Sequence, residues 1–279
     1  MAATTLPAAA LAFDAVADAF DTRFGPWASV AAQRRAVRAA LLAAFPAGAR
    51  VLEIGGGTGE DALFLARQGR EVLLTDASPS MVRVAAAKLA GEPRARAELA
   101  AAEELERLAE GRRAEGAEAF DGAFSNFAGL NCVPDLSPVA RGLARLVRPG
   151  GAALLVLFGP LPPGEIVTET ARGRFRSAFR RLARGDVPAR LGGREFVVRY
   201  HRPAQVARVM APWFRPVRRL GIGVFVPPSA AEPWISGHPT FLNALEMLDR
   251  AVSRPLALLG DHVLYHFERT DVPAPGGEP

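Results

Sequence analysis

The sequence is poor in cysteine and lysine and has no long hydrophobic run. Cys132 is the only cysteine among 279 residues, which excludes an intramolecular disulfide, a cysteine-based zinc site and redox chemistry by a cysteine pair. No purely apolar run, Ala152 to Phe158 among the longest, approaches the roughly 20 residues that cross a bilayer. The first twenty residues hold Asp14 and Asp18 but no basic stretch that would begin a signal peptide. We therefore expect a cytoplasmic protein without a membrane span.

Composition and charge indicate a globular chain of one or two domains. The sequence is 49% hydrophobic and 23% charged, which excludes disorder, collagen and coiled coil for the chain as a whole. Residues 171–220 hold 14 arginines against Asp186 and Glu195, a net charge of +12, which leaves −7 for the rest of a chain whose total is +5. Lys88 is the only lysine, so this arginine excess reflects composition in part and is weak evidence for nucleic-acid binding.

Short apolar runs alternate with helical stretches over the first 160 residues, which is typical of βα units and a mostly parallel sheet. Beyond residue 160 the pattern changes, and a basic amphipathic helix is expected at 171–184. The proline- and glycine-rich tail from Val272 is expected to be disordered. The expected strands are 51–54, 71–75, 95–101, 122–126, 152–158, 196–200, 217–226 and 262–267, and the other expected helices are 61–67, 81–89, 137–147, 203–210 and 241–252.

A glycine-rich turn follows the first expected strand. The run Gly55-Gly56-Gly57-Thr58-Gly59 leaves no side chains that would collide with a ligand near the backbone. Asp76, at the end of the second strand, is able to accept two hydrogen bonds from a ribose diol. The two features together predict a nucleoside-containing cofactor at the carboxyl edge of the sheet.

The glycine spacing and the nearby acids distinguish between cofactors. The loop has the pattern G-x-G-x-G, whereas a dinucleotide site has G-x-G-x-x-G. Glu53, Glu60 and Asp61 would repel a pyrophosphate, but they would not repel a cationic sulfonium amino acid. The pattern therefore favours a sulfonium cofactor.

Four motifs resemble those of class I S-adenosylmethionine-dependent methyltransferases, in the same order. They are VLEIGGGTGEDALFLARQG, LLTDAS, FDGAFSNFAGLN and LVRPGGAALLVLF, and FDAVADAFDTRF resembles the lid helix of the small-molecule members. The resemblance implies an α/β, Rossmann-like fold: a seven-stranded, mostly parallel sheet with an antiparallel last strand, plus a helical lid and an insertion. It also implies S-adenosylmethionine as cofactor, S-adenosylhomocysteine as product and a small-molecule methyl acceptor.

The resemblance also assigns cofactor contacts. The glycines would lie under the methionine part, Asp76 would hold the ribose, Met81 would pack on the adenine, and Asn126 with Phe127 would border the methyl-transfer site. Glu103 would stand in for an acid that the family often places, followed by alanine, after the third strand, and Phe20 occupies a position where tyrosine is frequent. The full predicted set is Glu53, Gly55, Gly56, Gly57, Asp76, Ala77, Met81, Glu103, Asn126, Phe127 and Phe20.

Four regions are expected along the chain. Residues 1–48 would form the N-terminal helical lid and residues 49–159 the S-adenosylmethionine-binding core. Residues 160–270 would complete the sheet and carry the substrate-binding insertions, and residues 271–279 would be the disordered tail. Arg34, Arg35 and Arg38, ahead of the core, are expected on a solvated helix face.

Catalysis in this family needs few side chains, because the sulfonium methyl group is already activated. A base matters only for a protonated oxygen or nitrogen acceptor, and His201, beside Tyr200, is the candidate. His262 and His266 lie ~13 Å apart by strand rise, which is too far to chelate one metal ion, so no metal is expected.

Acceptor specificity is expected in residues 160–210 and 227–260. Phe175, Phe179 and Leu182 of the helix at 171–184 are expected to pack against the acceptor as a lid; an anion or membrane patch and a solvated face are the other interpretations. Nearby phenylalanine and tryptophan favour an apolar acceptor.

Three other functions fit the sequence less well. They are an NAD-dependent oxidoreductase, an RNA methyltransferase or nucleic-acid binder that uses the arginine-rich insertion, and a non-catalytic protein that keeps the cofactor fold. The missing G-x-G-x-x-G argues against the first, and the absence of interleaved aromatics and of a second RNA-binding module argues against the second. The oligomeric state is not predicted.

Overall fold

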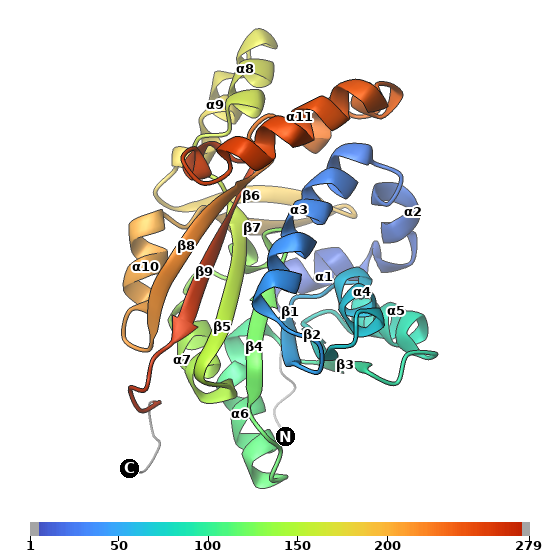
Figure 1. Cartoon of the computed structure of the whole chain (residues 1–279). Coiled ribbons are helices and arrows are strands. Elements are labelled where there is room, and N and C mark those ends of the chain that lie inside the picture. Colours follow the sequence, from blue (N-terminus) through green and yellow to red (C-terminus); the bar gives the residue numbers. More distant parts are fainter. Residues whose placement is uncertain (1–5, 275–279) are drawn as a thin grey trace.

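The computed structural model describes residues 6–274, in which a seven-stranded sheet lies between two layers of helices (Figure 1). The strand order is β3-β2-β1-β4-β5-β9-β8; β1 to β5 pair in parallel, and β9 is antiparallel to both β5 and β8. The last strand in sequence is thus antiparallel, and the predicted fold class is confirmed. The strands are β1 Arg50–Ile54, β2 Glu71–Asp76, β3 Ala95–Leu99, β4 Phe120–Ser125, β5 Val147–Phe158, β8 Phe214–Ile222 and β9 His262–Arg269.

Each face of the sheet has its own hydrophobic core. Strand residues alternate between them: Leu154 and Val156 of β5 pack toward α3, α4 and α5, whereas Leu155 and Leu157 pack toward α6, α7 and α10. This alternation explains why β5 is apolar on every residue of its second half, as a strand buried on both faces must be. The helices are α3 Ala28–Ala44, α4 Glu60–Arg67, α5 Pro79–Leu89, α6 Leu105–Ala114, α7 Ser137–Leu146 and α10 Pro203–Met210.

The N-terminal segment lies at the carboxyl edge of the sheet, beside α4 and α5 (Figure 1). It consists of α1 Ala8–Asp14, a 3-10 turn at Ala17–Ala19 and α2 Phe20–Phe24. A hairpin of β6 Asp186–Leu191 and β7 Arg194–Arg199 packs on it, with Phe13 and Phe196 rings 6.0 Å apart. The two parts that flank the sheet's carboxyl edge therefore contact each other.

The predicted helix at 171–184 is wrong. The chain forms α8 Pro163–Ala171, a turn at Gly173 with φ of +71°, the short α9 Phe175–Ala178 and a 3-10 turn at Arg180–Leu182. A left-handed residue cannot continue an α-helix, so the apolar spacing on either side of Gly173 does not form one stripe. Phe175 and Phe179 are accordingly 61% and 49% exposed.

Other expectations hold with shifted ends. Helix α11, Pro239–Val252, packs against α3 and β8 (Figure 1). Strand β6 was not predicted, and the strand expected at 217–226 begins three residues earlier and ends four residues earlier. Residues 275–279 of the predicted disordered tail lie outside the described residues. Within the described residues, no helix is both long and apolar enough to cross a membrane.

Candidate functional site

The glycine loop after β1 presents two glycines to open space. Gly55 and Gly57 have φ of +64° and +56°, and a Cβ built on either would meet no atom within 4 Å. Gly56 faces inward instead, where a Cβ would lie 2.5 Å from the Leu74 side chain and 2.8 Å from the Glu53 carboxyl carbon. The loop therefore has a packed side and an open side, and the open side is free to receive a ligand against the backbone.

Asp76, at the end of β2, closes one flank of this space. Its Oδ2 accepts a hydrogen bond from the Gly57 amide and its Oδ1 one from the Ser78 amide, each at 2.9 Å. Burial raises the pKa of Asp76 despite these bonds. A carboxylate has about four lone-pair sites, so it retains capacity for two hydroxyl donors. Ala77 follows directly in the chain. Met81, another residue of the predicted set, is buried in the first turn of α5.

Glu53 supplies an enclosed acid beneath the loop. The side chain is 2% exposed, and its Oε2 has no hydrogen-bond partner in residues 6–274. Burial, together with the negative charges of Asp61 and Asp76, raises the pKa of Glu53 well above its usual value, and Arg34 opposes this shift. A buried carboxyl oxygen without a donor is costly, and a cationic N–H group of a ligand would satisfy it.

Asp61 of α4 organises the adjoining side chains. Its carboxylate accepts hydrogen bonds from Arg34 Nη1, Arg38 Nε and Asn126 Nδ2, each at 2.7 Å. Arg34 and Arg38 are each 21% exposed, so the expectation of a solvated helix face is wrong for these two. Both ends of the Asn126 amide are engaged, because its Oδ1 accepts a hydrogen bond from the Phe127 amide at 2.8 Å. Asn126 therefore fixes the loop after β4.

Phe127 and Ala128 have strained backbones. Their φ values of +47° and +60° lie in the left-handed region that non-glycine residues avoid, and such strain gathers at ligand sites. The Phe127 ring is held from two sides, by the Arg34 guanidinium 4.6 Å above it and by His262 in an edge contact at 5.8 Å. An aromatic ring is thus fixed at the carboxyl end of β4.

The N-terminal segment is tied to the loops after β1 and β2. Asp21 accepts a hydrogen bond from Thr58 Oγ1 at 2.6 Å and one from Lys88 Nζ at 2.7 Å. Asp14 accepts one from Ser78 Oγ at 2.8 Å, and hydrogen bonds to Ser78 and Ser80 lower the pKa of Asp14. These contacts close the segment over the glycine loop.

Phe20 and Glu103 have fewer contacts. The Phe20 ring packs against Phe13 and Phe24, with centroids 6.3 and 4.8 Å away. Glu103 lies in the 3-10 turn Ala102–Glu104 that follows β3. Burial, then the charges of Asp76 and Glu103, raise the pKa of Cys132 to about 12.

His201 is separate from these residues. The ring is 3% exposed, Nε2 donates to the Val133 carbonyl oxygen at 2.9 Å, and Nδ1 is enclosed without a partner. Burial lowers the pKa of His201. In the described residues no hydrogen bond or ring contact joins His201 to the glycine loop, Asp76 or Phe127, so its role as a base stays a prediction.

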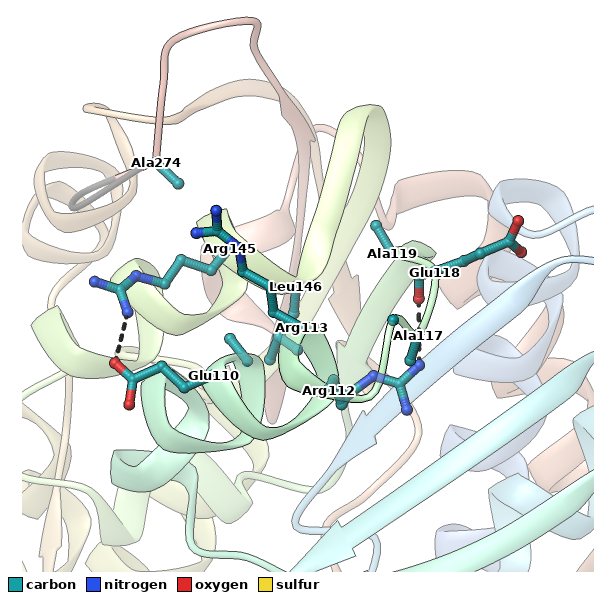
Figure 2. A pocket seen from close by; sticks show the side chains of 11 residues that line it. Glu110, Arg112, Arg113, Ala117, Glu118, Ala119, Arg145, Leu146 and Ala274 are labelled. Carbon is teal, nitrogen blue, oxygen red and sulfur yellow. Dashed lines mark hydrogen bonds and ion pairs between the residues drawn. The ribbon is translucent and has the colours of Figure 1, made fainter. Parts of the chain in front are cut away.

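A groove of about 420 Å³ lies at the opposite edge of the sheet, where β4 begins (Figure 2). It is lined by residues of α6 and α7, among them Arg112, which donates to the Glu118 carbonyl oxygen, and Arg145, which pairs with Glu110 at 3.1 Å. None of the predicted site residues lines this groove.

Comparisons with known proteins agree with this geometry. The family model described as a methyltransferase domain matches residues 51–151, which include the glycine loop, Asp76 and Asn126. No curated protein matches the chain.

Solved structures share the fold at low identity. The CcbJ methyltransferase of Streptomyces caelestis is 18% identical with a TM-score of 0.53, covering 86% of this chain and 89% of that one. Geranyl diphosphate C-methyltransferase of Streptomyces coelicolor is 13% identical with a TM-score of 0.51, covering 85% and 79%. A chain in the complex of the Haloferax volcanii Trm112 methyltransferase activator is 15% identical with a TM-score of 0.53, covering 92% and 97%.

The family match and the shared fold confirm the predicted family resemblance and the predicted cofactor, S-adenosylmethionine. Residues 51–151 match a methyltransferase domain, and the chain shares the fold of S-adenosylmethionine-dependent methyltransferases of known structure.

Proposed function

We propose that the protein transfers the methyl group of S-adenosylmethionine to a small molecule with an apolar body. One observation carries the proposal: the open faces of Gly55 and Gly57 lie beside the Asp76 carboxylate, and the unpartnered carboxyl of Glu53 lies beneath the same loop. Acids beside and beneath the loop attract a sulfonium and an ammonium group and repel a pyrophosphate. The same charges argue against the NAD-dependent alternative.

Each side of this space would hold a different part of the cofactor. Glu53 would accept the amino group, and Asp76 would accept the ribose hydroxyls. Ala77, Met81 and Glu103 would surround the adenine. Asn126 and Phe127 would border the methyl group from the carboxyl end of β4.

When bound, the cofactor supplies an activated methyl group, and the chain's task is to align the acceptor with it and exclude water. The strained loop at Phe127 and the Asp61 hydrogen bonds fix one wall of the reaction space. The closed N-terminal segment, held through Asp14 and Asp21, shields the cofactor side.

Aromatic side chains favour an apolar acceptor over nucleic acid. The Phe158 and Tyr200 rings lie with centroids 5.6 Å apart, and Phe127 and Phe158 both contact the His262 ring. Several arginines of the basic insertion are engaged within the protein, such as Arg181, which is 6% exposed, and Arg199, which pairs with Asp186. Fewer arginines are therefore free to bind phosphate groups than the net charge of residues 171–220 implies.

Calorimetry of S-adenosylmethionine binding tests the cofactor assignment. Asp76→Ala should weaken binding by about 1.5 to 3 kcal/mol, the range for hydrogen bonds to a charged group. Asp135→Ala is the matched control, because Asp135 also accepts an amide two residues on at 2.9 Å but lies outside the site. Unchanged affinity in a folded Asp76→Ala protein would refute the placement.

The acceptor is found by a separate experiment. The protein and S-adenosylmethionine with a labelled methyl group are incubated with a cell metabolite extract, and the labelled product is identified by mass spectrometry. A small apolar product is expected. Label in RNA alone would favour the nucleic-acid alternative.

A further inference from the structure

A second polar cluster lies beside Phe127 and was not predicted as a site. His262, the first residue of β9, is 6% exposed and pairs across the sheet with Phe158, the last residue of β5. Its ring stacks on Phe158, with centroids 5.1 Å apart and planes 24° apart, and contacts Phe127 edge-on. The imidazole is therefore fixed between the ends of β4 and β5, next to the proposed methyl-transfer position.

The tautomer of His262 follows from its neighbours. Nδ1 lies 3.1 Å from Gln33 Oε1 and 3.5 Å from Asp261 Oδ2. The Gln33 amide has one consistent orientation, because its Nε2 must donate to Asp261 Oδ2 at 3.2 Å, which turns Oε1 toward the histidine. Both neighbours of Nδ1 are acceptors. Nδ1 therefore carries the proton, and Nε2 carries a lone pair.

The Nε2 atom is left available. It has no hydrogen-bond partner in residues 6–274. Unlike Nδ1 of His201, which is fully enclosed, it keeps some exposed surface. The Tyr200 hydroxyl has the same two properties, and its ring lies on the Phe158 ring that His262 stacks on. Two accessible polar atoms thus flank one aromatic ring.

The charged groups around the imidazole lie on α3, α8, the 3-10 turn Arg180–Leu182 and the residue that precedes β9. Arg181 donates to Asp261 Oδ1 at 2.6 Å and to Glu165, so the Asp261 carboxylate stays ionised beside the histidine. Burial lowers the pKa of His262, Asp261 raises it and Arg181 lowers it again, which leaves a neutral ring near pH 7. The charged or titratable groups facing the ring are Asp261, Arg181, Glu165, Tyr200 and, across Phe127, Arg34.

We propose that Nε2 of His262 is the general base for a methyl acceptor with an acidic hydroxyl on a planar apolar body, such as a phenol or an enol. In the step, the acceptor oxygen bonds to the methyl carbon as the carbon–sulfur bond breaks. The sulfur keeps the electron pair and leaves as a neutral thioether, and the hydroxyl proton passes to Nε2. Asp261 stabilises the imidazolium that forms, and the acceptor ring lies between Phe127 and Tyr200.

This inference rests on the proposed function, and it replaces His201 with a histidine whose free nitrogen is accessible. His201 cannot act without a change, because its Nε2 hydrogen is bonded to the Val133 carbonyl and its Nδ1 is sealed. Gln33 is a positioning residue here, since it acts only through the imidazole. The sequence separation of 229 residues between Gln33 and His262 explains why no local motif reveals the pair.

The first test needs no acceptor. In ¹⁵N-histidine NMR at neutral pH, His262 should show a protonated Nδ1 and a bare Nε2, and it should titrate below the usual pKa of about 6.5. Gln33→Leu should shift the tautomer balance without altering the His266 signals. A protonated Nε2 in the neutral ring would overturn the proposal.

The second test uses the acceptor-containing fraction of the metabolite extract. His262→Asn should lower methyl transfer by about 10² to 10⁴-fold, the usual contribution of a general base, and abolish the acid-side fall in rate. Its S-adenosylmethionine affinity should stay within threefold, and His266→Asn, on the same strand, is the control. A full rate with an unchanged pH profile in His262→Asn would overturn the base. Failure of the wild-type protein to bind S-adenosylmethionine would instead overturn the proposed function.

Discussion

The two segments that flank the carboxyl edge of the sheet are held by different interactions. The N-terminal segment is tied down by hydrogen bonds and ion pairs from Asp14 and Asp21 to the loops that form the cofactor side. The segment of α8 and α9 is anchored chiefly by one buried arginine, Arg181, and leaves Phe175 and Phe179 exposed. The proposed cofactor side is thus closed by polar contacts, whereas the proposed acceptor side keeps apolar surface uncovered.

This difference separates two tasks. A cofactor common to a whole family calls for a fixed cover, and polar contacts at set positions provide it. An acceptor with an apolar body calls for a surface that packs against it, and exposed phenylalanines provide that. Changes in the N-terminal segment should therefore alter cofactor retention, and changes in α8 and α9 should alter acceptor handling.

The largest expected effect is on the anchor of the acceptor side. Arg181→Ala leaves Asp261 and Glu165 buried without their cation, which should lower the free energy of unfolding by about 3 to 5 kcal/mol in chemical denaturation. Arg176→Ala, exposed and without an ion pair in the described residues, should change it by under about 0.5 kcal/mol. Similar small losses in both variants would show that Arg181 is not an anchor.

The same anchor should give the protein an acid-labile component. Burial raises the pKa of Asp261, but His262, Arg181 and hydrogen bonds lower it on balance. A depressed folded pKa adds stability that is present above the unfolded value of about 3.9 and is lost as pH falls through the folded pKa. Unfolding free energy measured from pH 6 downward should thus fall more steeply below pH 4 in the wild type than in Arg181→Ala.

The glycine loop tests the cofactor side. Gly57→Val places a branched side chain in the open space and should weaken S-adenosylmethionine binding at least 100-fold, about 2.8 kcal/mol. Gly116→Val is matched in backbone strain, since Gly116 has φ of +67° and an open Cβ direction but lies at the opposite edge. That control should bind normally. Tight binding by a folded Gly57→Val protein would make the loop a structural turn only.

The first βαβ unit was predictable because residues close together in the sequence form it. Gly55 and Gly57 adopt positive φ, which glycine tolerates best, and Asp76 is the last residue of its strand, so the sequence pattern alone indicates the geometry. The seven-stranded sheet followed from the same alternation of apolar runs. Several strand ends moved, by up to five residues at the start of β5, because pairing partners and not composition set them.

The rest depended on contacts between distant residues. The sequence predicted that Arg34 and Arg38 lie on a solvated helix face, whereas the fold places Asp61 of α4 against them. It likewise predicted His262 only as a strand residue, whereas Gln33 and Phe127, both distant in sequence, contact its ring. The 171–184 region misled because its apolar spacing fits a helix, whereas Gly173 at positive φ divides it.

The N-terminal cover should have a modest effect that shows mainly in kinetics. Asp21→Asn weakens partly exposed contacts to Thr58 and Lys88, each worth about 0.2 to 1 kcal/mol, so S-adenosylmethionine should dissociate a few-fold faster in stopped-flow experiments. Asp18→Asn is the control, because Asp18 pairs with Arg83 on an exposed surface and should change nothing measurable. An equal change in both variants would mean that the segment does not cover the cofactor.

The smallest effect on cofactor binding is expected from the acceptor side. Replacing Phe175 and Phe179 by serine removes exposed rings, so S-adenosylmethionine affinity should stay within about threefold, under ~0.7 kcal/mol. Methyl transfer to the acceptor of the metabolite extract should fall strongly, because the rings are expected to pack on its apolar body and exclude water. Val217→Ser, an equally exposed apolar position on β8, serves as the control for general surface effects. Parallel losses of cofactor affinity and turnover in the phenylalanine variant would mean that α9 supports the core rather than the acceptor, and the division between the two segments would not hold.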